Sequence, residues 1–198
     1  RPLSYLSIEH KQKWIVDWVY PLVLAILSTG LLFCLKRFGT IALYADGALI
    51  AKILGFVQSL PGFYIAALAA IATFNKLDID KTMPKPAPKL DVMVQGQIVP
   101  IELTRRRFLC SMFAFLTTEN LILIVLAIFG QAIYLPAKAI IPQKFHSFAS
   151  AIYMLIFLFA FWQMLITSFW GLFYLGDRLH QHRQHDEEPQ PSAVELLH

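Results

Sequence analysis

Four long apolar segments decide what this sequence can fold into. They cover residues 16–35, 50–74, 108–129 and 148–175. A helix of about 20 residues crosses the ~30 Å hydrocarbon core of a bilayer. Of the whole chain, 57% is hydrophobic and 15% is charged, whereas about 25% of a typical soluble domain is charged. The sequence therefore predicts an all-α membrane protein, a four-transmembrane-helix bundle.

The polar segments complete the predicted domain organisation. Residues 1–175 form one transmembrane domain, in which 75–107 is the long loop between the second and third spans and 130–147 is a shorter loop. Residues 176–198 form a tail that begins as an extension of the fourth helix and ends acidic and proline-rich, a composition typical of disorder.

Local patterns predict three further features. Residues 4–15 alternate apolar and charged side chains, which favours an interfacial helix with Trp14 in lipid and Lys13 in water. Apolar residues flank Gln-Gly-Gln at 95–97, which predicts a small β-hairpin in the long loop. Thr104 is a good N-cap for the third span.

The distribution of basic residues predicts the orientation. Twelve Lys and Arg lie in the N-terminal segment, the loop 75–107 and the tail, whereas five lie in the other two loops. Positive charge accumulates on the cytoplasmic side of membrane proteins. We therefore expect both termini and the long loop in the cytoplasm, and a multi-pass protein of the bacterial inner (cytoplasmic) membrane.

A layer of polar and helix-breaking residues is predicted near the middle of the bilayer. An acidic residue at that depth costs about 2.5–3.5 kcal/mol on insertion scales, so Glu119 should face the bundle interior, where burial favours its neutral form. Pro61 and Gly62 should kink the second span. The members of this predicted polar belt are Glu119, Asn120, Gln163, Ser28, Thr29, Pro61 and Gly62.

Two interpretations of Glu119 remain open at this stage. In the structural one, its protonated carboxyl group bonds to Gln163 or to a carbonyl freed by Pro61 and holds the helices together. In the functional one, the belt lines a water-filled path or switches when the bundle rearranges. Exchanging Glu119 for Gln separates them, since only the second predicts intact assembly with lost activity.

A basic set on the predicted cytoplasmic side is suited to anionic lipid or an acidic partner face, or simply reflects topology. Its members are Lys76, Lys81, Lys85, Lys89, Arg105, Arg106 and Arg107.

No metal or cofactor is expected, since the spacing of His180, His182 and His185 favours a solvated face over a zinc site. Cys34 and Cys110 are expected at opposite membrane faces as free thiols.

Enzyme signatures are absent from the sequence. It contains no GxSxG, no HExxH and no glycine-rich phosphate loop, so we expect a protein that is not an enzyme. The modest net charge of +4 reports topology, and no direct nucleic-acid binding is expected.

One resemblance adds a specific expectation. The text AIATFNKLDIDKTMPKPAPKL at the end of the second span, followed by ELTRRRFLCSMFAFL, resembles in its layout the small four-helix membrane subunits of the bacterial anti-phage system Kiwa (the KwaA family). The resemblance covers most of the chain in length, span count and loop placement. It implies a homo-oligomer, possibly a tetramer, that detects infection at the inner membrane and holds a cytosolic KwaB-like protein partner.

Three functions therefore remain to be compared. The first is a membrane sensor or scaffold that docks a cytosolic effector through the loop 75–107 and the tail. The second is an oligomeric ion channel or membrane-permeabilising effector with Glu119 in the conduction or gating path. The third is a small transporter or lipid-acting enzyme, which should hold a ligand at the level of the polar belt.

Overall fold

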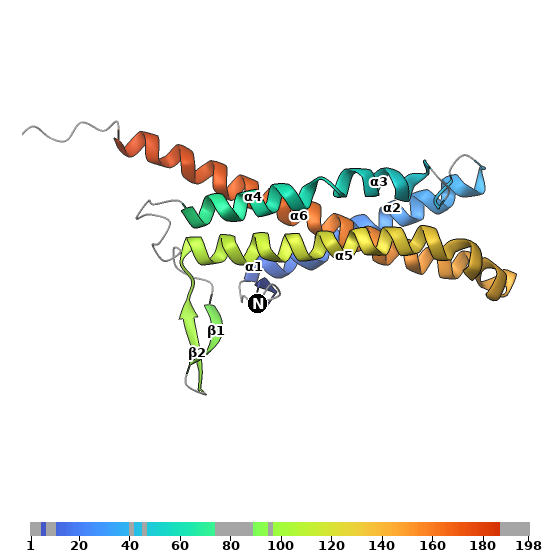
Figure 1. Ribbon diagram of the computed structural model, residues 1–198, viewed down its shortest axis with the longest axis horizontal. Coiled ribbons are helices and arrows are strands. Elements are labelled where there is room, and N and C mark those ends of the chain that lie inside the picture. The colour runs from blue at the N-terminus through green and yellow to red at the C-terminus, as the bar shows by residue number, and fades with distance from the viewer. Residues whose placement is uncertain are drawn as a thin grey trace, which may run out of the picture.

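The protein is represented by a computed structural model that describes residues 5–6, 11–39, 42–44, 47–73, 89–94 and 97–186. In this part of the chain four helical segments are long and apolar enough to cross a membrane: Ile15–Arg37, Leu49–Thr73, Arg105–Ile140 and Gln143–Phe173. The chain is thus a multi-pass membrane protein by length and composition, as the sequence predicts. Figure 1 shows these helices side by side in one elongated bundle.

The first span is built from three consecutive helical pieces. A short helix α1 (Lys11–Trp14) continues into a π-helix η2 (Ile15–Val19) and then into α2 (Tyr20–Arg37). Pro21 lies in the first turn of α2, and because α2 continues directly from η2, its missing N–H leaves one helical hydrogen bond unmade. Trp14 is exposed, as predicted, but Lys13 is not in water: it is largely buried against Asp17. The helical periodicity failed for Lys13 because its carboxylate partner holds it against the bundle.

The second span is interrupted. Helix α3 (Leu49–Val57) ends just before α4 (Leu60–Thr73) begins, so the predicted distortion falls at residues 58–59, ahead of Pro61. The proline ring clashes with the carbonyl four residues earlier, which belongs to Val57, and α3 ends at that residue. The Ser59 hydroxyl donates to the carbonyl of Phe56 at 2.9 Å, which helps to close the end of α3.

The third span is longer than the sequence predicts. Helix α5 runs over Arg105–Ile140, with Thr104 as its N-cap as expected. The predicted loop 130–147 is therefore wrong over residues 130–140, which are helical with Pro136 inside. Since Pro136 is near the end of α5, it removes only one of the last hydrogen bonds. Tertiary contacts favour the extension, because the Tyr44 ring stacks on Tyr134 with centroids 4.3 Å apart.

The remaining elements are a short 3-10 turn η4 (Gln143–Phe145), the long helix α6 (His146–Asp186) and two strands. Strands β1 (Lys89–Val94) and β2 (Gln97–Glu102) pair antiparallel, with Val92 opposite Val99. The strands, the start of α5 and the end of α6 lie at one end of the bundle, the hairpin end (Figure 1). The α2–α3 connection and the α5–α6 turn lie at the opposite end.

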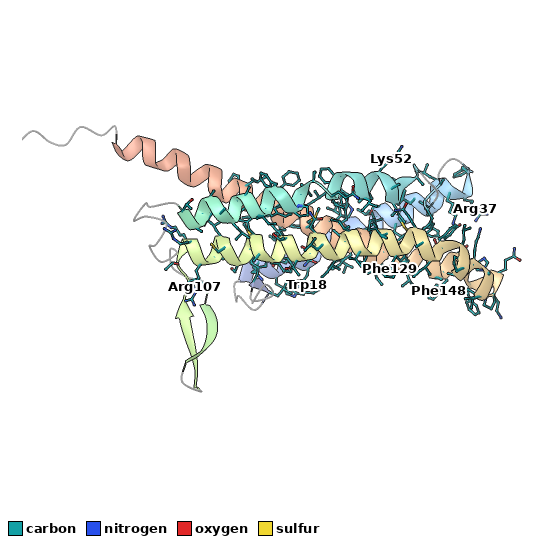
Figure 2. All side chains as sticks on the ribbon, in the orientation of Figure 1. Trp18, Arg37, Lys52, Arg107, Phe129 and Phe148 are labelled. Atoms are coloured by element: carbon teal, nitrogen blue, oxygen red, sulfur yellow. The ribbon has the colours of Figure 1, made fainter. Side chains whose placement is uncertain are left out.

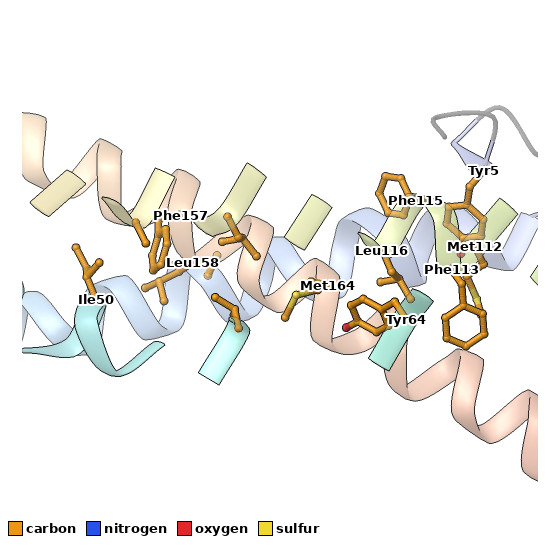
Figure 3. Close-up of a cluster of buried hydrophobic side chains, with 14 of the residues drawn as sticks. Tyr5, Ile50, Tyr64, Met112, Phe113, Phe115, Leu116, Phe157, Leu158 and Met164 are labelled. Atoms are coloured by element: carbon orange, nitrogen blue, oxygen red, sulfur yellow. The ribbon is translucent and has the colours of Figure 1, made fainter. Parts of the chain in front are cut away.

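Helices α5 and α6 form the centre of the bundle. Helix α2 packs on α6, while α3 and α4 pack on α5. The largest fully buried side chains include Tyr64, Phe113, Phe157 and Met164, several of which Figure 3 shows between the helices. The outer face of α2 carries exposed apolar side chains such as Leu27, as a lipid-facing helix should. The core thus holds α5 and α6 in a fixed register.

A buried hydrogen bond joins α4 to α6 and gives a first prediction. The Tyr64 and Ser168 hydroxyl oxygens lie 2.6 Å apart, and Ser168 donates to the Met164 carbonyl, so Tyr64 is the donor. Replacing Tyr64 with Phe should lower the free energy of unfolding by about 0.6–1 kcal/mol, the typical value of an interhelical bond in a membrane. Denaturation in mixed micelles measures this loss. Tyr20→Phe is the matched control because Tyr20 is exposed, and equal losses in both variants would contradict the prediction.

Candidate functional site

Glu119 and Asn120 lie inside the bundle on α5. Their side chains are 7% and 0% exposed. Within the described residues, Glu119 Oε2 and both polar atoms of the Asn120 amide have no hydrogen-bond partner. An unpaired buried polar group costs about 1–3 kcal/mol, and most such groups in folded proteins are paired. Packing alone therefore gives no reason for a carboxyl and an amide at this place.

The belt residues of α2 and α6 meet in part. The indole N–H of Trp162, the residue directly before Gln163, donates to Ser28 Oγ at 3.2 Å. Thr29 and Gln163 are both buried. No hydrogen bond joins Glu119 to Gln163 in the described part of the chain, so the structural interpretation of Glu119 lacks its expected bond.

The interruption of the second span lies near the level of Glu119. Tyr64 of α4 contacts Phe113 of α5, with ring centroids 6.2 Å apart. These helices run antiparallel. Glu119 is about six residues beyond Phe113 on α5, and Gln58 is about six residues before Tyr64 on the second span, so the two positions lie at about the same level. Pro61 is the second residue of α4, one turn away, and a methyl group added at Gly62 would meet no atom within 4 Å. The α3–α4 break thus lies level with the part of α5 that carries the acid.

Three residues absent from the predicted belt form a compact ionic cluster next to it. Asp17 of η2 is 2% exposed, and its carboxylate accepts a hydrogen bond from Tyr5 at 3.3 Å. Lys13 Nζ lies 3.0 Å from Asp17 Oδ2 and 4.3 Å from the centre of the Tyr5 ring. Two signals could have identified the cluster: the i,i+4 spacing of Lys13 and Asp17, and an acid within an apolar span.

The cluster lies close to Glu119. Asp17 is near enough for the two carboxyl groups to influence one another, and the hydroxyls of Tyr5 and Tyr64 are within electrostatic range of Glu119. Asp17 lies at the start of the first span. The buried acid of α5 therefore has a second buried acid beside it.

The basic residues of the hairpin end have different surroundings. Arg106 Nη1 donates to the carbonyls of Ile71 and Ala72 at 3.0 and 3.1 Å, where it caps the C-terminus of α4. Arg107 is exposed, and Figure 2 shows it at the end remote from Arg37 and Lys52. Arg106 thus has a structural role, while Arg107 faces outward.

Other sequence-predicted positions are described less fully or not at all. Lys76, Lys81 and Lys85 lie outside the described residues, and Lys89 is described only as part of the β1 backbone. The positions of His180, His182 and His185 are helical within α6. Cys34 and Cys110 are free thiols.

The chain was compared with known proteins in three ways. No protein-family model, no curated protein and no solved structure matches it.

Proposed function

We propose that this protein is the membrane subunit of a multi-component bacterial system, of an anti-phage kind. In this proposal the bundle senses infection or a perturbation of the membrane, and its cytoplasmic side docks a soluble effector protein. The observation that carries the proposal is the hairpin end, where two elements extend beyond what a four-helix bundle needs.

The first of these elements is the β1–β2 pair. Neither strand packs extensively against a helix, and Figure 1 shows the pair projecting away from the bundle. A two-stranded hairpin is marginally stable in water unless another surface covers it. A partner protein that binds the hairpin would supply that surface.

The second element is the continuation of α6. The apolar sequence of α6 gives way to charged and polar residues from Asp177 on, but the helix continues to Asp186. The excess of Lys and Arg in the segments at the hairpin end supports a cytoplasmic location for both elements. The layout resemblance to KwaA supports a KwaB-like partner and a homo-oligomeric state. It also supports a location of the protein in the inner membrane.

Site-specific photocrosslinking tests the docking proposal. A photoreactive amino acid at Val99 of β2 should capture one defined cytosolic protein in bacterial cells, whereas the same probe at Gln143 of η4, at the opposite end, should not. The products are identified by mass spectrometry after purification in mild detergent. The same proteins captured from both positions, or no protein captured from Val99, would overturn the proposal.

A second function is favoured by the unpartnered atoms of Glu119 and Asn120. Buried polar groups without a partner among the described residues suit an oligomeric channel with Glu119 in its conduction or gating path. In liposomes, ion flux should change when Glu119 is replaced by Gln. Thr118→Val is the matched control, because the Thr118 hydroxyl donates to the carbonyl of Ala114 in its own helix at 2.9 Å. Equal flux through all three proteins would exclude this function.

A further inference from the structure

Tyr5 occupies an aromatic slot on the surface of α5. Its side chain is 5% exposed. The ring stacks on Phe115 with centroids 5.2 Å apart and tilts against Phe108 at 6.1 Å. Figure 3 shows Tyr5 above Met112 of the same helix, near Phe115. Tyr5, which precedes the first span, thus packs against α5 of the third span.

Polar contacts hold Tyr5 in this slot. Burial and the charge of Asp17 raise the pKa of the Tyr5 hydroxyl far above its usual range, so the hydroxyl stays protonated and donates to Asp17. Lys13 completes the arrangement, since its ammonium group lies between the Asp17 carboxylate and the face of the Tyr5 ring. The ammonium, the ring and the carboxylate therefore support one another.

Glu119 lies on the same face of α5 as the aromatic residues that contact Tyr5. Phe108, Phe115 and Glu119 are seven and four residues apart, so they lie on one face of α5. Glu119 is the next position on this face beyond the residue on which Tyr5 stacks. On the other side, Asp17 lies at the centre of the π-helix η2, a distortion that is frequent at functional sites.

We propose that Tyr5, Lys13 and Asp17 form a latch that closes the approach to Glu119 from the hairpin end. With the latch closed, the Tyr5 ring and the Lys13–Asp17 pair separate the Glu119 carboxyl group from water. When the latch opens, the ring leaves the slot and the approach to Glu119 is free. The latch does not depend on the docking function, because it concerns access to one side chain within this chain.

The composition of the latch suits reversible opening. The aromatic contacts are lost on opening, but the ammonium and carboxylate groups regain hydration, which offsets part of the cost of separating them. Lys13 retains 12% side-chain exposure, so water can reach the pair from the outer side.

Cysteine accessibility tests the latch directly. In a background with Cys34→Ser and Cys110→Ser, Glu119→Cys is the reporter, and a charged, membrane-impermeant methanethiosulfonate is the probe. Tyr5→Ala removes the ring and Asp17→Asn removes the ion pair. Each should raise the labelling rate of the reporter by about tenfold, since aromatic contacts or a charged hydrogen bond are lost. Tyr5→Phe keeps the ring and should have a smaller effect.

Two controls separate the latch from general loosening of the bundle. Tyr20→Ala changes an exposed tyrosine of the same span and should leave the labelling rate unchanged. A second reporter, Thr29→Cys, lies at a buried position outside the latch and should stay unlabelled in the Tyr5→Ala protein. The proposal is overturned if the Glu119→Cys reporter is labelled as fast with Tyr5 present as without it, or if both reporters gain labelling together.

Discussion

Replacement of Lys13 by methionine should destabilise the protein by about 3–5 kcal/mol, the usual cost of removing one partner from a buried ion pair. Methionine keeps most of the apolar stem of lysine but leaves the Asp17 carboxylate, which is 2% exposed, without its cation. The Tyr5 hydroxyl still donates to Asp17, but a neutral donor replaces little of the lost charge interaction. Equilibrium unfolding in mixed micelles, followed by circular dichroism, measures the effect.

A double variant identifies the cause of this loss. Lys13→Met combined with Asp17→Asn has no unpaired charge, so it should recover most of the stability that Lys13→Met alone loses. Lys36→Met is the control for loss of a lysine at the surface, because the exposed Lys36 ammonium contacts only the Phe33 ring, at 5.4 Å, among the described interactions. A double variant as unstable as the single one would show that the charge on Asp17 is not what Lys13 offsets.

The four spans could be predicted because each one is a local property of the sequence. An apolar run of ~20 residues has few alternatives to crossing a bilayer as a helix. The Thr104 N-cap and the start of the tail as an extension of α6 are local in the same sense. Errors arose where distant residues decide the outcome. Pro136 predicted a loop, but stacking of Tyr44 on Tyr134 accompanies a helix that runs on to Ile140.

The candidate site was predictable only in part, for the same reason. Glu119 is conspicuous in the sequence because it is an acid within an apolar run. Its partners are not, because they depend on the rotation and register of several helices. Tyr5 meets α5 across about a hundred residues of sequence, and the π-helix η2 changes the direction of Asp17 relative to an ordinary α-helix. Helical periodicity alone therefore placed Lys13 in water and passed over Asp17.

Replacement of Asn120 by leucine should stabilise the bundle by about 1–3 kcal/mol, because it removes a buried amide for which the described residues supply no hydrogen-bond partner. Leucine has a similar volume, so the packing of α5 against α6 should change little. If Asn120 serves the same path as Glu119, the more stable variant should also lose ion flux or the response to infection. Gain of stability with loss of function is the signature of a residue kept for activity.

Thr117→Val is the matched control for Asn120→Leu. The Thr117 hydroxyl donates to the carbonyl of Phe113 at 2.8 Å, so it is satisfied within α5, and its removal should change stability little. The opposite result for Asn120 would be equally informative. If Asn120→Leu destabilises the protein, the amide is paired in the membrane by a group other than the described residues, and a second copy in a homo-oligomer would be the first place to search for it. Crosslinking between copies, compared for the natural protein and Asn120→Leu, would then locate that contact.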